Sequence, residues 1–94
     1  MANNNNEFGT RPLIKTNADE KHFQDEMIRE SLKIVYEALC EKGYDPVAQI
    51  IGFLMSGDPT YITAHNNARI IACRLDRDEM MRVIIRDFFQ ETSR

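Results

Sequence analysis

The chain has 94 residues, 43% of them hydrophobic, and a formal net charge of −3. At this length we expect one domain, which as a monomer would bury only about 60 to 65% of its unfolded surface. The charge balance argues against a nucleic-acid partner, because nucleic-acid-binding domains carry a pronounced basic patch. No apolar run approaches about 18 residues and no secretory signal is evident, so we expect a cytoplasmic protein without membrane insertion.

Residues 1–21 begin with four consecutive asparagines and show little hydrophobic periodicity. Such a polar segment cannot bury enough apolar surface to fold alone, which predicts a disordered N-terminal tail. The remaining residues, 22–94, are expected to form one helical dimerisation domain.

A first helix is predicted from His22 or Phe23 to Lys42, because one apolar stripe repeats at helical spacing: Ile28, Leu32, Val35 and Leu39. The opposite face is charged, and Asp25 and Arg29 have the i,i+4 spacing of a helical ion pair. Cys40 lies at the edge of the stripe, where we expect a buried structural thiol.

A second helix is predicted from Pro46 to Ser56, because Asp45 can cap its start and the segment 57–59 interrupts it. Between these limits Gln49 is the one strongly polar residue. A helix that is apolar on every side is expected to be buried on every side. We therefore predict that its apolar residues form the core or a dimer contact: Ile50, Ile51, Phe53, Leu54 and Met55.

The next segment, residues 58–62, is predicted to form a turn or a single 3₁₀ turn. A third helix should follow over residues 64–75, with Thr63 as its N-cap. Small side chains at Ala68 and Ala72 would let another helix approach closely.

A fourth helix is predicted over residues 77–91, because Asp76 and Glu79 have the spacing of a capping box. Its wide apolar stripe of Met, Ile and Phe, which includes Phe88, is typical of a core or a subunit interface. The sequence therefore predicts an all-α fold: a compact bundle of four to five short helices after a disordered tail, forming a homodimer.

Residues that could carry catalysis are scattered and have no known catalytic or metal-site spacing: His22, His65, Cys40, Cys73 and several carboxylates. The acidic group at residues 76–79 is explained by helix capping. The segment 56–59 is not a phosphate loop, because it follows a helix and contains no lysine. We therefore expect no enzyme activity, no cofactor and no metal, and a small hydrolase has no support.

An acidic helix-turn-helix DNA-binding regulator is the alternative interpretation. The predicted third helix carries Arg69 and Arg74, which could contact phosphates. However, the connection from Ser56 to Thr63 is longer than the roughly three or four residues of that motif. The acids at residues 76 and 78 also weaken the field that a phosphate backbone would experience.

The segment Gly-Tyr-Asp-Pro-x-x-Gln-Ile-Ile-Gly-Phe-x-x-Ser-Gly-Asp-Pro-x-Tyr-Ile, at residues 43–62, resembles the central signature of the IreB family of small bacterial regulatory phosphoproteins. Further matches follow in the same order and spacing, and the resemblance covers residues 27–90. The residues that carry it are Gly43, Tyr44, Pro46, Gln49, Gly52, Ser56, Gly57, Asp58, Pro59, Tyr61, His65, Arg69, Arg77, Asp78 and Glu79.

This resemblance implies a small, all-helical, non-enzymatic homodimer. It implies phosphorylation on N-terminal threonines by a transmembrane Ser/Thr kinase, reversed by a cognate phosphatase. The expected role is to modulate the cell-wall and envelope stress response, including antibiotic resistance, through an unknown downstream protein target. By position, Thr10 is the first candidate for the phosphoacceptor and Thr16 the second.

Overall fold

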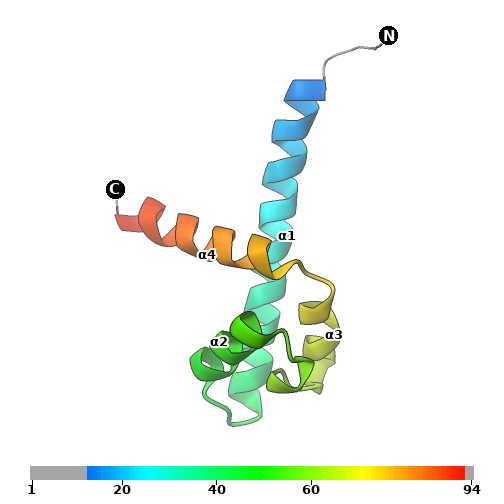
Figure 1. The fold of residues 1–94 in the computed structure, drawn as a ribbon, viewed down its shortest axis with the longest axis vertical. Helices are drawn as coiled ribbons and strands as arrows, with labels where there is room; N and C mark the ends of the chain where they lie inside the picture. Colours follow the sequence, from blue (N-terminus) through cyan, green and yellow to red (C-terminus); the bar gives the residue numbers. More distant parts are fainter. Residues whose placement is uncertain (1–12, 93–94) are drawn as a thin grey trace.

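The computed structural model describes residues 13–92, with side chains described for residues 19–90. The elements in chain order are α1 (Leu13–Glu41), α2 (Pro46–Ser56), the 3₁₀ turns η1 (Pro59–Tyr61) and η2 (His65–Asn67), α3 (Ala68–Cys73) and α4 (Arg77–Thr92). Every regular element of this part of the chain is helical, so the predicted all-α class is confirmed (Figure 1).

Helix α1 has 29 residues and begins at Leu13, well before the predicted start at residue 22. The later start was predicted because residues before 22 lack hydrophobic periodicity. However, the sequence contains no glycine or proline between Pro12 and Gly43 that would break a helix. Residues with adequate helix propensity can therefore extend the helix as a solvated rod. Residues 13–21 are thus not part of a disordered tail, and residues 1–12 lie outside the described part of the chain.

The core forms where α2, α3 and α4 pack on the C-terminal half of α1 (Figure 1). Ala68 and Ala72 are 0% and 2% exposed, so the small residues of α3 do allow the close approach expected of them. The buried apolar residues are Ile28, Val35, Ala38, Leu39, Phe53, Ile62, Ala68, Ala72, Met80 and Val83. The N-terminal part of α1 and the C-terminal part of α4 extend away from this core, and the chain measures 55 × 33 × 21 Å (Figure 1).

Helix α2 has the predicted bounds and the predicted caps. Asp45 Oδ1 accepts hydrogen bonds from the backbone N–H groups of Val47 (3.1 Å) and Ala48 (3.2 Å). Gly57 ends the helix with φ 76° and donates its N–H to the carbonyl of Phe53. A left-handed residue at this place satisfies a carbonyl that would otherwise be orphaned.

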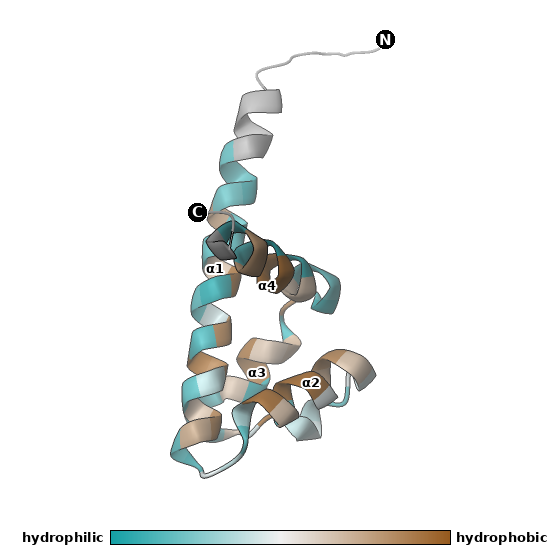
Figure 2. Ribbon diagram, turned by 90° about the vertical axis from the view of Figure 1, so that its left-hand side faces the viewer, coloured by the Kyte–Doolittle hydropathy of each residue, from teal (hydrophilic) through white to brown (hydrophobic). Residues whose placement is uncertain are grey.

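The expectation that α2 is buried on every side is wrong for the single chain. Phe53 is buried and Ile50 and Leu54 are half-buried, but Ile51 is 54% and Met55 78% exposed. Helix α2 packs on α1 and on η1, and no described segment covers the face that carries Ile51 and Met55 (Figure 2).

The predicted third helix is broken into two pieces. Asn66 and Asn67 have φ angles of 54° and 61°, so η2 ends there and α3 is left with only six residues. Asparagine is among the few non-glycine residues that enter the left-handed region easily. The Asn-Asn pair was the sequence signal for this break.

Helix α4 begins at Arg77 as predicted and ends at Thr92. Asp76 Oδ1 accepts the N–H of Asp78 at 2.9 Å, whereas the Glu79 carboxylate contacts Lys21 at 3.3 Å. Phe88 is 60% exposed, so it is not part of the single-chain core. Within residues 13–92, no helix is long and apolar enough to cross a bilayer.

Candidate functional site

The signature residues gather around the end of α2 and the turns that follow it. Gly52 faces the ring of Tyr61, and a Cβ at this position would lie 2.8 Å from Tyr61 Cζ and closer still to the ring edge. Gln49 Nε2 donates to the carbonyl of Tyr61 at 3.0 Å. A glycine is therefore required at position 52 because the aromatic ring lies directly on the helix backbone.

The segment 56–59 is held by its own hydrogen bonds. Ser56 Oγ donates to the carbonyl of Gly52 at 2.7 Å and accepts the N–H of Asp58 at 3.0 Å. Asp58 Oδ1 accepts both the N–H and the hydroxyl of Thr60, at 3.0 and 2.7 Å. The backbone hydrogen bond, then the hydroxyl hydrogen bond, lowers the pKa of Asp58. These polar groups are engaged in forming the turn.

Two signature arginines bind backbone carbonyl groups. Arg69 Nε donates to the carbonyl of Ile62 at 2.9 Å, and Arg77 Nη1 donates to that of Leu54 at 2.9 Å. A Cβ at Gly57 would lie 2.9 Å from Arg77 Cζ, so this glycine also makes room for the guanidinium. Arg77 thus connects the start of α4 to α2, 23 residues earlier, while Arg69 ties α3 to the segment seven residues before it.

His65, the histidine among the signature residues, lies in η2 and faces the C-terminal end of α1. His65 Nε2 is 2.7 Å from Glu41 Oε1, and Asn66 Nδ2 approaches the same oxygen at 3.4 Å. Thr63 Oγ1 accepts the N–H of His65, but Ala64 is the N-cap of η2 and Asn67 that of α3, so the prediction that Thr63 is the N-cap of the third helix is wrong. These contacts fasten η2 to the C-terminal end of α1.

The remaining candidates do not form a reactive cluster. Cys40 and Cys73 are both free and exposed, so the expected burial of Cys40 is wrong. In the described part of the chain no three His, Cys, Asp or Glu residues are placed to hold a metal ion. Thr16 lies within α1, and Thr10 lies outside the described residues.

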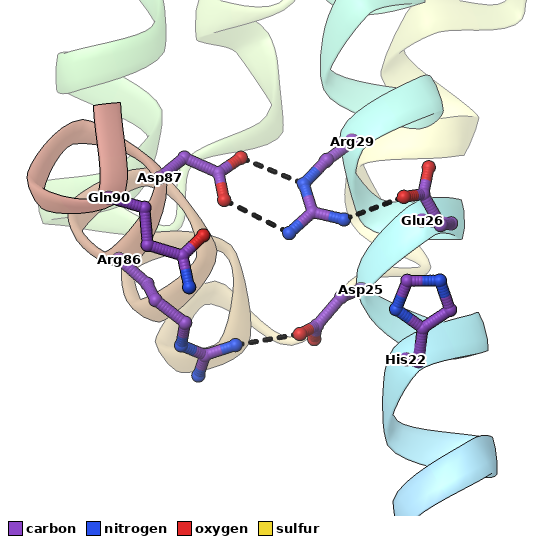
Figure 3. A pocket seen from close by; sticks show the side chains of 7 residues that line it. All are labelled: His22, Asp25, Glu26, Arg29, Arg86, Asp87 and Gln90. Atoms are coloured by element: carbon purple, nitrogen blue, oxygen red, sulfur yellow. Dashed lines mark hydrogen bonds and ion pairs between the residues drawn. The ribbon is translucent and has the colours of Figure 1, made fainter. Parts of the chain in front are cut away.

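A polar cleft between α1 and α4 was not predicted from the sequence (Figure 3). Its volume is about 430 Å³, and its lining residues are His22, Asp25, Glu26, Arg29, Arg86, Asp87 and Gln90. Side chains from the two helices point toward one another across it. The cleft thus joins two segments that lie far apart in the chain.

Two ion pairs cross this cleft. Arg29 donates through Nε and Nη2 to the two carboxylate oxygens of Asp87, at 2.8 and 3.0 Å. Arg86 Nη1 donates to Asp25 Oδ2 at 2.6 Å. The i,i+4 pair expected between Asp25 and Arg29 is therefore replaced by contacts to α4. A paired fork of this kind fixes orientation as well as distance.

The Arg29–Asp87 pair also shifts proton binding. The hydrogen bond from Arg29 lowers the pKa of Asp87, although partial burial opposes it. In return the hydrogen bond to Asp87 raises the pKa of Arg29. Asp25 is 7% exposed, and its Oδ1 is buried without a hydrogen-bond partner in the described structure. The cleft is best understood as a structural connection between the two helices, because both of its arginines are paired with carboxylates of the opposite helix.

We predict that Gly52→Ala lowers the stability of the fold when residue 61 is tyrosine and raises it when residue 61 is alanine. In the wild-type background it should destabilise the fold by about 1 to 3 kcal/mol, since the Tyr61 ring must move away. In a Tyr61→Ala background it should stabilise by about 0.5 to 1 kcal/mol, because alanine favours a helix more than glycine does. Urea unfolding of the four proteins of this cycle measures the coupling. Equal effects in both backgrounds would contradict the contact.

We predict that Asp87→Asn lowers stability at neutral pH and flattens its pH dependence in acid. The pKa of Asp87 is lower in the folded than in the unfolded chain, where it is about 3.9. Its contribution is therefore complete above that value and is lost as the pH falls through the folded-state pKa. Urea unfolding from pH 7 to pH 2.5 provides the measurement, with exposed Glu37→Gln as control. Parallel curves for Asp87→Asn and the wild type would refute it.

Comparisons with known proteins agree with this picture. A UPF0297 protein of Lachnoclostridium phytofermentans is 54% identical over 55 residues, which cover 58% of this chain and 62% of the relative's length. Residues 14–90 match the family described as IreB regulatory phosphoprotein. This range includes every described signature contact, from Gln49 with Tyr61 to Arg77 with Leu54. The chain therefore belongs to the IreB family.

Proposed function

We propose that this chain is a non-enzymatic, cytoplasmic regulatory phosphoprotein that acts as a homodimer. Its kinase is a transmembrane Ser/Thr kinase opposed by a cognate phosphatase, and its output adjusts the cell-wall and envelope stress response through a downstream protein. The observation that carries this proposal is the family match over residues 14–90, whose description is that of a regulatory phosphoprotein. The polar signature residues support a non-enzymatic role, because their side chains form hydrogen bonds to backbone carbonyl groups that hold the fold together.

Exposed apolar faces on two helices support the dimer. On α2, Val47, Ile51 and Met55 form a stripe at steps of four residues and are 57%, 54% and 78% exposed. On α4 the exposed apolar residues are Ile84, Ile85, Phe88 and Phe89. Contiguous apolar surface on a small chain is typical of a subunit interface.

A groove beside α4 offers a place for a partner subunit. Its volume is about 500 Å³, and its apolar lining comes from Leu32 and Tyr36 of α1 and from Val83 and Ile84 of α4. Phe88 and Phe89 pack edge to face, with ring centroids 5.1 Å apart, at the end of the same helix. A second copy that covered the groove would bury aromatic and aliphatic side chains together.

The surroundings of the hydroxyl groups favour an N-terminal phosphoacceptor. A kinase needs the acceptor in an extended, accessible segment. Ser56, Thr60 and Thr63 are each engaged in the hydrogen bonds of their turns. Thr16 lies within α1, which would have to unwind locally. Thr10 is therefore our first choice and Thr16 our second.

The DNA-binding alternative gains no support from the helix arrangement. Helix α2 ends at Ser56 and α3 begins only at Ala68, so the connection is much longer than the turn of a helix-turn-helix motif. Arg69, which a DNA reader would need on its surface, donates to the carbonyl of Ile62.

We predict that Ile51→Asp converts the wild-type dimer to monomers. A carboxylate within an apolar interface lacks a partner, and a cost of at least about 1.4 kcal/mol corresponds to at least a tenfold weaker association. Light scattering at several protein concentrations measures the mass. Met27→Asp is the matched control, since Met27 is 52% exposed but lies on a different face of the molecule. A wild-type protein that is monomeric at all concentrations would refute the dimer.

We predict that the cytoplasmic domain of the envelope-sensing kinase phosphorylates the wild-type chain mainly on Thr10. Thr10→Ala should remove most of the incorporated phosphate, while Thr16→Ala should remove little, because Thr16 is held in a helix. Phosphopeptide mapping after reaction with the purified kinase identifies the site, and the cognate phosphatase should reverse it. Modification confined to residues 22–94, or none at all, would overturn the regulatory mechanism.

A further inference from the structure

Helix α1 carries a second apolar stripe that no described helix covers. Phe23, Met27 and Ile34 are 63%, 52% and 39% exposed and fall on one face of the helix. Together with Glu26, Glu30 and Ser31 they line a shallow hollow of about 350 Å³. Glu20 is exposed one turn before Phe23. We call Phe23, Met27 and Ile34, with Glu20, Glu26 and Glu30, the acid-rimmed strip.

This strip is separate from both packed faces of α1. Ile28, Val35 and Leu39 are buried in the core on one side of the helix. Asp25 and Arg29 point toward α4 on another side (Figure 3). The apolar residues of the acid-rimmed strip therefore belong to neither the core nor the cleft between α1 and α4, and Glu26 alone lies at the border of both the strip and the cleft.

The charges of the rim are available to a partner. Glu26 Oε2 accepts from Arg29 Nη1 at 3.0 Å, and Glu30 lies 3.9 Å from Lys33. Both pairs lie within one helix, and both glutamates are more than half exposed, so these pairs contribute little to stability. An incoming cation could replace them at small cost. The hollow's charged lining is exclusively acidic.

Charge decides which occupant fits. Two copies of the strip placed against each other would bring their glutamates together, and like charges in an interface are costly. An anionic membrane surface would be repelled for the same reason. The exposed face of α4 is bordered by Asp78 and Arg82, so it offers no surplus of positive charge to this rim. An apolar stripe with basic edges is the complementary surface.

We propose that the acid-rimmed strip binds an amphipathic helix of a partner protein, with apolar side chains toward Met27 and Lys or Arg along its edges. The strip runs from Phe23 to Ile34, which at about 1.5 Å per residue corresponds to about three helical turns. The partner segment is thus a short helix laid along α1. This proposal does not depend on the phosphorylation or the dimer proposed above.

The probe is a fluorescein-labelled amphipathic peptide of about four turns made of Leu and Lys, compared with a Leu and Glu counterpart of the same pattern. The full-length wild-type protein should raise the anisotropy of the Leu/Lys peptide and not that of the Leu/Glu peptide. Met27→Asp should weaken Leu/Lys binding at least about tenfold, since a buried methionine contact is lost. Raising the salt concentration should weaken it as well.

Charge reversal provides the decisive comparison. Glu20→Lys/Glu30→Lys should abolish binding of the Leu/Lys peptide and create binding of the Leu/Glu peptide. Glu26 is left unchanged because it also contacts Arg29. Met55→Asp, on the exposed face of α2, is the matched control and should leave peptide affinity unchanged. Circular dichroism melting should show that all variants remain folded.

Amide chemical-shift mapping with the Leu/Lys peptide should place the largest changes at residues 20–34. Changes centred on residues 84–89 would overturn the proposal, as would unaltered peptide preference in the charge-reversed variant. Conversion of a wild-type dimer to monomers by Met27→Asp would identify the occupant as a second copy and would also overturn it. A wild-type monomer that still binds the Leu/Lys peptide at residues 20–34 would refute the dimer and leave this proposal standing.

Discussion

The apolar side of α1 is the surface on which the whole fold depends. Helices α2, α3 and α4 each pack on α1, and Leu39 on this side is 0% exposed. One helix of 29 residues offers enough length for three neighbours but only one side to each. The outer sides of α2 and α4 therefore keep apolar residues in solvent, and these are the faces that the proposed second subunit would cover.

Sequence signals predicted the fold where they act locally. Asp45 and Gly57 mark the ends of α2 because a cap depends only on neighbouring backbone groups. The prediction of one continuous third helix was wrong because two consecutive asparagines in the left-handed conformation interrupt an otherwise helical pattern. Burial around α2 could not be predicted, since an apolar pattern states that a face needs cover but not which chain provides it. The start of α1 was missed because a solvated helix has no hydrophobic period.

Several of the signature residues contribute to a structural framework: Tyr61 packs on Gly52, Arg77 lies beside Gly57, and Arg69 donates to the carbonyl of Ile62. The cleft between α1 and α4 was missed because each of its ion pairs joins residues that are far apart in the sequence. The partners are separated by 58 positions in one pair and by 61 in the other. Spacing alone favoured an i,i+4 pair within α1. Only the direction in which α4 crosses α1 decides that Asp25 meets Arg86 instead.

The position of Arg77 has a mechanical consequence. It is the first residue of α4, and its guanidinium is fastened to the end of α2 through the carbonyl of Leu54. Helix α4 is thus a lever pivoted at one end and latched to α1 part of the way along by Arg86 and Asp87. Phe88 lies eleven residues from the pivot, about 16 Å at the usual rise of a helix, so a rotation of about 10° would carry it about 3 Å. Because the ion pairs of Arg86 and Asp87 lie next to Phe88, such a movement of the aromatic end of α4 requires these pairs to open.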